Sequence, residues 1–244
     1  HCLPYMDDEI HSVLDLGSGT GSGVLACSYL INNKYDITCL EREDEMINFV
    51  KSNIDNTPNF IKHDSSKGLP NIHSDLVISS YFLNELDDSS RDVVLNDIWN
   101  NANKYILIVE PGTPNAFKMI KYIRDYYLSK GGYIVGPCPH SGICPLAKDD
   151  WCHFVTRVTR SRLHKLLKDA DVPYEDEKFS YICISKSPCK HASNRLLRHP
   201  IIKGNAISIS LCNKDGKKID KDVTKKDKEV FKLVKKLSTG DSLD

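Results

Sequence analysis

Residues 12–23 read Ser-Val-Leu-Asp-Leu-Gly-Ser-Gly-Thr-Gly-Ser-Gly, so that a short apolar run leads directly into a glycine-rich turn. The run at 12–16 is typical of a buried strand, and the residues after the glycines predict a helix that ends near Leu30. Glycines in this position let the backbone approach a ligand, and the following helix offers free amide hydrogens at its first turn. The stretch therefore predicts a nucleotide-type binding loop.

The spacing Asp-x-Gly-x-Gly-x-Gly resembles motif I of class I S-adenosylmethionine methyltransferases more than the Gly-x-Gly-x-x-Gly of dinucleotide enzymes. The resemblance implies that Asp15 holds the methionine part of the cofactor, that Glu41 binds the ribose and that Asp64 contacts the adenine amine. The predicted cofactor site is Asp15, Gly17, Gly19, Gly21, Glu41 and Asp64. Three other interpretations stay open, namely a tight turn without ligand, acids that only cap helices and turns, and an NAD-type protein.

Outward from this loop, short apolar runs alternate with amphipathic segments. This pattern predicts a parallel, doubly wound α/β sheet, a Rossmann-like fold. The strands are expected at 12–16, 36–40, 59–63, 74–79 and 105–110. We divide the chain into a Rossmann-like core (1–136), a cysteine-rich insert (137–154), the end of the core (155–190) and a basic extension (191–244). In the extension we expect two short strands, at 206–211 and 217–219, and a lysine-rich helix.

The segment after the predicted fourth strand gives no catalytic signature. Residues 79–85, Ser-Ser-Tyr-Phe-Leu-Asn-Glu, contain neither the Asp/Asn-Pro-Pro-Tyr/Phe of nucleobase amino-methyltransferases nor the Pro-Cys nucleophile of cytosine-C5 enzymes. Tyr81, Asn84 and Glu85 are candidates to line an acceptor pocket, although packing or capping explains them equally well. The catalytic residues stay unknown.

Charge is distributed unevenly along a chain that is neutral overall. Its 33 Lys and Arg balance 33 Asp and Glu, yet residues 186–236 hold 15 basic and 5 acidic side chains. This asymmetry favours a polyanionic partner for the extension, the alternative being a solvated lysine-rich tail. No apolar run has the roughly 18–20 residues of a membrane span, so we expect no membrane partner. We also expect the protein to be a monomer.

Three of the nine cysteines, Cys138, Cys144 and Cys152, fall in one Pro- and Gly-rich segment. Thiolates are soft ligands that suit zinc or iron–sulfur iron, and proline directly follows two of the cysteines, as in ferredoxins. Either metal needs a fourth ligand, for which the candidates are Cys212, Cys189, His140 and His153. Three unligated cysteines are the remaining alternative, and Cys27, Cys39 and Cys183 are expected in the core.

Several segments resemble one family closely: the methyltransferase-like proteins associated with the mitochondrial small ribosomal subunit, and their bacterial relatives. The segments are Pro-Cys-Pro-His-Ser-Gly-Ile-Cys-Pro-Leu at 137–146, Asp-Trp-Cys-His-Phe at 150–154, 157–164, 174–181 and Arg-Leu-Leu-Arg-His-Pro at 195–200. The resemblance implies binding to small-subunit rRNA during late assembly and a methyltransferase fold of doubtful activity. It also implies a 4Fe–4S cluster on Cys138, Cys144, Cys152 and Cys212. One departure is Thr239, where the family usually has tryptophan.

Two basic regions are expected to contact rRNA phosphates. The first is a helix over 161–168, with Arg157, Arg160, Arg162, Lys165 and Lys168 within about three turns. The second is the tail with Lys225, Lys226, Lys228, Lys232, Lys235 and Lys236. Such contacts give affinity without sequence readout. Our hypothesis is that the cluster folds the insert and so presents this basic surface.

The function predicted from these features is small-subunit assembly with S-adenosylmethionine and 4Fe–4S cofactors, zinc being the alternative metal. The first alternative function is an active rRNA methyltransferase, and the second is a methyltransferase of a non-RNA substrate. Because no transit peptide is visible, we expect the bacterial cytoplasm, with the mitochondrial matrix as the alternative.

Overall fold

The computed structural model describes residues 2–6, 8–55, 57–167, 169 and 171–243. Five parallel strands form one side of its main sheet, in the order β3-β2-β1-β4-β5. They are β1 (Ser12–Leu16), β2 (Asp36–Glu41), β3 (Asn59–Lys62), β4 (Ser74–Ser80) and β5 (Ala102–Pro111). The helices between them are α1 (Ser22–Leu30), α2 (Asp44–Asn53) and α3 (Asp88–Asn101), and α4 (Pro114–Ser129) follows β5. The five predicted strands are confirmed, with β5 beginning earlier than expected.

The sheet continues with antiparallel strands after β5. They are β6 (Tyr133–Gly136), β7 (Phe154–Thr159) and β8 (Tyr174–Ser185). The end of β8 lies between β5 and β6, with Ile184 opposite both Ile106 and Ile134. Because the strands are covered on both faces, their side chains are apolar almost throughout, and Leu14 and Leu16 are fully buried.

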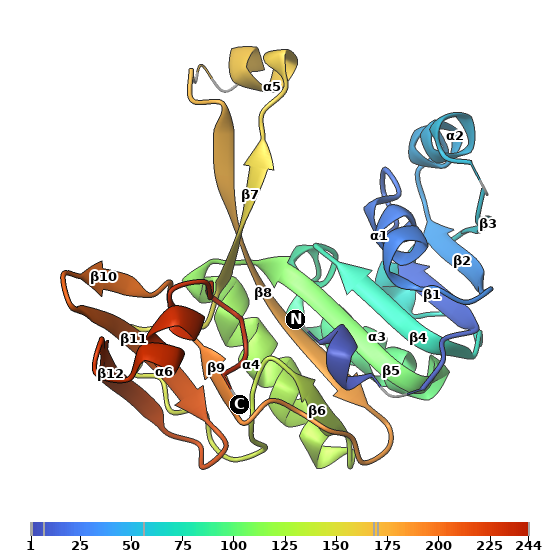
Figure 1. The fold of residues 1–244 in the computed structure, drawn as a ribbon. Coiled ribbons are helices and arrows are strands. Elements are labelled where there is room, and N and C mark those ends of the chain that lie inside the picture. The colour runs from blue at the N-terminus through green and yellow to red at the C-terminus, as the bar shows by residue number, and fades with distance from the viewer. Residues whose placement is uncertain (1, 7, 56, 168, 170, 244) are drawn as a thin grey trace.

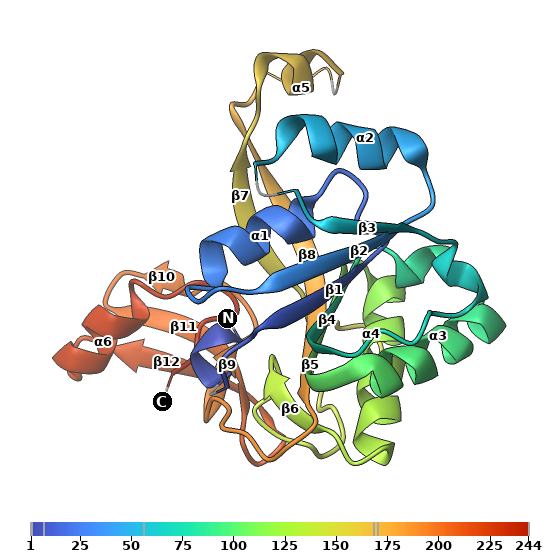
Figure 2. The same cartoon turned by 90° about the vertical axis from the view of Figure 1, so that its right-hand side faces the viewer.

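β7 and the first half of β8 form an arm that projects from the sheet and carries α5 (Arg162–Leu167) at its tip (Figures 1 and 2). The expected basic helix over 161–168 is therefore shorter, and Lys168 lies outside the described residues. Arg157 lies within β7, opposite Asp176 of β8, and its Nε donates to the Asp176 Oδ1 at 2.7 Å. Arg160 follows β7 and pairs with Glu175 at 3.3 Å. Two of the arm's basic side chains, Arg157 and Arg160, are thus paired with acidic neighbours within the arm.

The extension forms a second, four-stranded antiparallel sheet beside the main one (Figure 1). Its elements are β9 (Asn194–Leu196), β10 (Ile201–Lys203), β11 (Ala206–Asn213), β12 (Lys218–Thr224) and α6 (Lys228–Val234). A separate hydrophobic cluster that includes Leu196, Ile209 and Val234 stabilises it. The sequence predicted β11, part of β12 and the lysine-rich helix, but neither β9 nor β10.

None of the helices in the described part of the chain has the length and apolar character required to cross a membrane.

Candidate functional site

The glycine loop between β1 and α1 has a backbone that side chains other than glycine rarely adopt. Gly17, Gly19 and Gly21 have φ values of 60°, 50° and 85°. A Cβ on Gly17 would lie 2.9 Å from Cδ2 of Phe82, which packs against the loop. Gly21 is the N-cap of α1, so the loop ends where the amide groups of that helix begin. This geometry explains the repeated glycines without reference to a ligand.

Glu41, at the end of β2, fixes the glycine loop through hydrogen bonds to backbone amides. Its Oε2 accepts a hydrogen bond from the Gly19 amide at 2.8 Å, and its Oε1 accepts from the amides of Arg42 at 2.8 Å and Glu43 at 3.0 Å. The side chain is almost fully buried. The carboxylate therefore links the loop to the end of β2 at the edge where parallel strands present ligand sites.

A cavity of about 610 Å³ opens above this loop. It brings together four of the predicted cofactor residues, namely Gly17, Gly19, Glu41 and Asp64. Its size is typical of small-molecule sites. Oδ1 of Asp64 accepts hydrogen bonds from the Ser66 amide at 3.2 Å and hydroxyl at 2.6 Å, so part of this carboxylate is used to cap a turn.

Asp15 is not among the residues that line this cavity. Its side chain is buried against α1, where a Cβ on Gly23 would lie only 2.4 Å from its Oδ2. That oxygen has no hydrogen-bond partner among the described residues. Burial raises the pKa of Asp15 to about 7, and the nearby Glu41 charge adds to the effect. Two of the predicted cofactor residues, Asp15 and Gly21, therefore do not line the cavity.

The segment after β4 contains the most strained residue near the cavity. Tyr81 has φ of 57°, which is unusual for a bulky side chain, and its ring lines the cavity while remaining 44% exposed. The buried Glu110 accepts a hydrogen bond from the Leu83 amide at 3.0 Å beneath this segment. Burial raises the pKa of Glu110 to about 7. Phe82 and Glu110 were not predicted to belong to the site, because in the sequence Phe82 has the pattern of an ordinary loop residue and Glu110 that of an ordinary strand residue.

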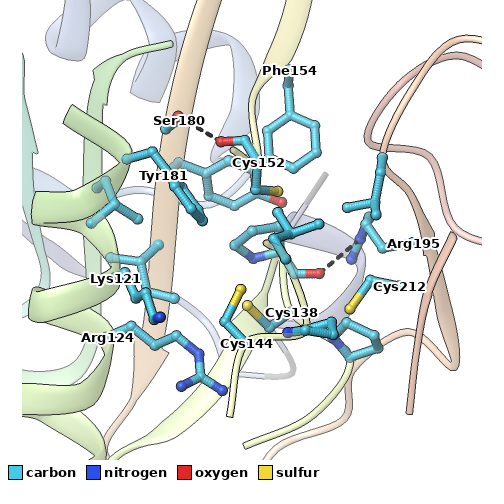
Figure 3. Close-up of a pocket in the computed structure, with 18 of the residues that line it drawn as sticks. Lys121, Arg124, Cys138, Cys144, Cys152, Phe154, Ser180, Tyr181, Arg195 and Cys212 are labelled. Atoms are coloured by element: carbon cyan, nitrogen blue, oxygen red, sulfur yellow. Dashed lines mark hydrogen bonds between the residues drawn. The ribbon is translucent and has the colours of Figure 1, made fainter. Parts of the chain in front are cut away.

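The cysteines of the insert and extension lie around a second pocket. Cys138, Cys144, Cys152 and Cys212 all line it, together with Arg124 and Arg195 (Figure 3). Cys212 comes from β11 and the other three from the irregular chain between β6 and β7. Cys189 does not line this pocket, and its thiol approaches the Ile134 carbonyl at 3.6 Å instead.

Three of the four pocket thiols lie where negative charge is unfavourable. Burial raises the pKa of Cys138, Cys152 and Cys212, the last to about 12, and mutual repulsion among the cysteines raises them further. Ionising them together requires a compensating cation. The described residues nevertheless contain no group of three or more His, Cys, Asp or Glu side chains that could hold a metal ion as they stand. The pocket therefore supplies a suitable donor set but not a finished coordination geometry.

Two buried arginines surround the cysteine loop. Nη2 of Arg124, from α4, donates to the carbonyls of His140 at 3.2 Å and Gly142 at 2.5 Å. Nε of Arg195, from β9, donates to the Pro137 carbonyl at 3.1 Å. The loop is thus fixed from the core on one side and from the extension on the other. Neither arginine was singled out for this pocket from the sequence, because nothing local marks them as neighbours of the cysteines.

The family model described as mitochondrial small ribosomal subunit Rsm22 matches residues 8–244 of this chain. The chain belongs to the Rsm22 family. This confirms the resemblance that the cysteine-rich segments carry.

Curated relatives of this family member are distant. The human ribosome assembly protein METTL17, mitochondrial, is 22% identical over 233 residues, covering 84% of this chain and 48% of that protein. The Rsm22-cox11 tandem protein 2, mitochondrial, of Schizosaccharomyces pombe is 23% identical over 285 residues, covering 94% of this chain and 38% of that protein. The chain thus spans less than half the length of these relatives.

Solved structures support the fold. The crystal structure of PH1948 from Pyrococcus horikoshii, a candidate RNA methyltransferase, superimposes with a TM-score of 0.50 at 16% identity, over 75% of this chain and 77% of that one. The core therefore has the Rossmann-like fold of S-adenosylmethionine methyltransferases.

Proposed function

We propose that this chain is a methyltransferase-like assembly factor that binds the rRNA of the small ribosomal subunit. The observation that carries the proposal is the family match over residues 8–244. The mitochondrial relatives, one of them named a ribosome assembly protein, support the same role and favour the mitochondrial matrix over the bacterial cytoplasm. The protein acts as a monomer in this proposal.

In this proposal the cavity above the glycine loop binds S-adenosylmethionine. Glu41 lies at its floor with both oxygens near backbone amides, in position to receive ribose hydroxyls as additional donors. Asp64 lines the same cavity, and in this proposal it contacts the adenine amine. Asp15 acts from beneath the loop by supporting its geometry, since it does not reach the cavity wall.

In the same proposal Cys138, Cys144, Cys152 and Cys212 hold a 4Fe–4S cluster in the second pocket, with zinc as the alternative occupant. Four soft thiols around one buried pocket, with two buried cations beside it, support this choice. Either occupant supplies the positive charge that allows the buried cysteines to ionise. The chain itself holds the insert and the extension together around the site.

The rRNA surface is proposed on the extension rather than on the arm. The six lysines of the tail, on and around α6, are all exposed: Lys225, Lys226, Lys228, Lys232, Lys235 and Lys236. Arg157 and Arg160 on the arm are instead paired with acidic neighbours. Phosphate contacts by the tail give an affinity that falls steeply with salt.

The test is co-sedimentation of the full-length protein with purified small subunits at several salt concentrations. The variant Lys232→Glu/Lys235→Glu is expected to bind at least tenfold more weakly and with a lower salt dependence. The matched control is Lys34→Glu/Lys118→Glu, two exposed lysines on the core, which is expected to bind normally. Equal binding by both variants contradicts the proposed surface.

An active rRNA methyltransferase is the second candidate function, favoured by the open cavity and by the intact loop glycines. Methyl transfer from labelled S-adenosylmethionine to isolated small subunits separates the two candidates. Labelled rRNA supports the enzyme, whereas binding without labelling supports the assembly factor. Transfer to a small molecule or protein in the absence of subunit binding supports a non-RNA substrate.

A further inference from the structure

Arg124 is an unusual residue for the buried face of a helix in the core. It is 3% exposed and shares that face of α4 with Ile120, Ile123 and Tyr127. Long cations are rarely buried unless a partner compensates the lost hydration. The neighbouring Asp125 accepts from its Nη1 at 2.6 Å, but that carboxylate is 56% exposed and points to solvent-accessible space. The burial of Arg124 therefore needs a further explanation.

The other contacts of Arg124 are directed to the cysteine loop. Its Nη2 donates to two carbonyls, those of His140 and Gly142, which lie between Cys138 and Cys144 in the sequence. The guanidinium makes these contacts with Nη2 while its Nη1 donates to Asp125, and the single nitrogen of a lysine ammonium cannot reproduce contacts from two separate nitrogens. Arg124 thus fixes the turn on which two of the four pocket cysteines depend.

Arg124 also faces the pocket with unused hydrogen-bonding capacity. It lines the pocket beside Cys138 and Cys144 (Figure 3), and its Nε has no hydrogen-bond partner among the described residues. A buried, unsatisfied donor on a cation favours an anionic neighbour. Four thiolates around a 2+ centre, whether a 4Fe–4S core or a zinc ion, carry a net charge of −2, which Arg124 and the equally buried Arg195 are placed to balance.

We propose that Arg124 is a positioning residue of the cysteine pocket, which fixes the turn between Cys138 and Cys144 and supplies buried positive charge to the metal-bound thiolates. The inference rests on the proposed metal site. It assigns to a core helix a direct part in building a site whose ligands all come from the insert and the extension.

The test uses the full-length protein, loaded anaerobically with iron and sulfide or with zinc, and the variants Arg124→Met and Arg124→Lys. The matched control is Lys118→Met, because Lys118 is an exposed cation on the same helix and does not line the pocket. The readouts are metal per chain, the rate of metal release to a chelator, the reduction midpoint of an iron-loaded sample and the circular dichroism spectrum.

Arg124→Met is expected to release metal at least tenfold faster than the wild type, in line with the effect of outer-shell partners on metal sites. Its iron-loaded form is expected to have a lower midpoint, since loss of a nearby cation disfavours the added electron. Arg124→Lys keeps the charge but not the planar group that donates from two nitrogens to Asp125 and to the turn, so it is expected to restore the midpoint more than the release rate. Lys118→Met is expected to match the wild type.

Release rates and midpoints for Arg124→Met that equal those of Lys118→Met overturn the inference while leaving the metal site intact. If Arg124→Met fails to fold, Arg124→Lys decides, and wild-type release by that variant overturns the positioning role. A wild-type protein that binds neither iron nor zinc overturns both this inference and the proposed metal site.

Discussion

Sγ of Cys212 lies 3.4 Å from Nε2 of His140, and both side chains are buried. Cys212 belongs to β11 of the extension, and His140 belongs to the insert between β6 and β7. The contact therefore joins two segments that are 72 residues apart in the sequence. Together with the contacts from Arg195 to Pro137 and Gly240, it makes the insert and the extension one structural unit.

Replacing Cys212 by serine is expected to remove most of the bound metal, because the fourth soft donor of the pocket is lost. Cys189→Ser is the control, since the Cys189 thiol lies outside the pocket. Iron, sulfide and zinc per chain after anaerobic loading provide the measurement. Equal metal content in the two variants contradicts the assignment of Cys212.

Glu41→Gln is expected to weaken S-adenosylmethionine binding by about tenfold or more, the effect of losing hydrogen bonds to a charged group. The amide of glutamine also brings a donor toward three backbone N–H groups that now point at the carboxylate. Titration calorimetry with the cofactor gives the affinity. Glu43→Gln, a more exposed acid at the same cavity, serves as the control, and wild-type affinity for Glu41→Gln would exclude Glu41 from the cofactor site.

Gly23→Ala is expected to destabilise the fold by about 1–3 kcal/mol, the usual cost of overpacking a core. The added Cβ would overlap Oδ2 of Asp15, a buried atom with little room to move. Thermal or urea unfolding measures the change. The exposed Ser28→Ala on the same helix is expected to stay within about 0.5 kcal/mol of the wild type. An unchanged midpoint for Gly23→Ala would show that α1 does not approach β1 this closely.

Asp15 also gives the stability a defined pH dependence. Its pKa is raised from 3.8 to about 7, so between these values the folded chain binds more protons than the unfolded chain. Stability from this group is therefore lost as the pH rises from about 4 through 7. Asp15→Asn removes this loss, so the stability of this variant relative to that of the wild type is expected to increase as the pH rises over that range.

Asp87→Asn provides the opposite case. Hydrogen bonds from Ser89 and Ser90 lower the pKa of Asp87, so its contribution is present above pH 4 and is lost as the pH falls. Unfolding midpoints measured from about pH 2 to 8 for both variants and the wild type test both signs, because the Asp87 contribution is lost only below about pH 4. A constant difference between Asp15→Asn and the wild type would contradict the buried, shifted carboxyl.

The sequence predicted the core well because its signals are local. The apolar runs and the loop from Gly17 to Gly21 specify strands, a turn and a helix without reference to distant residues. The position of the Asp15 side chain was harder to predict, because the same motif fits a carboxylate that lines the cavity and one that is buried against α1. Which of the two occurs depends on Gly23, whose missing Cβ leaves room beside α1.

The cysteine pocket was predictable only in part. The spacing of Cys138, Cys144 and Cys152 predicts a metal-binding segment, and the choice of Cys212 rested on family resemblance. Cys212 lines the pocket with these three cysteines, whereas Cys189 does not. The roles of Arg124 and Arg195 depend on how α4 and β9 pack against the loop, and no local pattern encodes that packing. The helix at the tip of the arm was predicted, but the strand β7 that carries Arg157 was not, because its charged residues pair across strands and not along a helix face.

The most direct test of the central claim is crosslinking of the full-length protein to RNA in cells, followed by sequencing of the bound RNA and mapping of the crosslinked peptides. The account predicts enrichment of small-subunit rRNA, with crosslinks in the extension around α6 and few on the arm. RNA recovered without enrichment of small-subunit rRNA, or crosslinks confined to the arm, would contradict it.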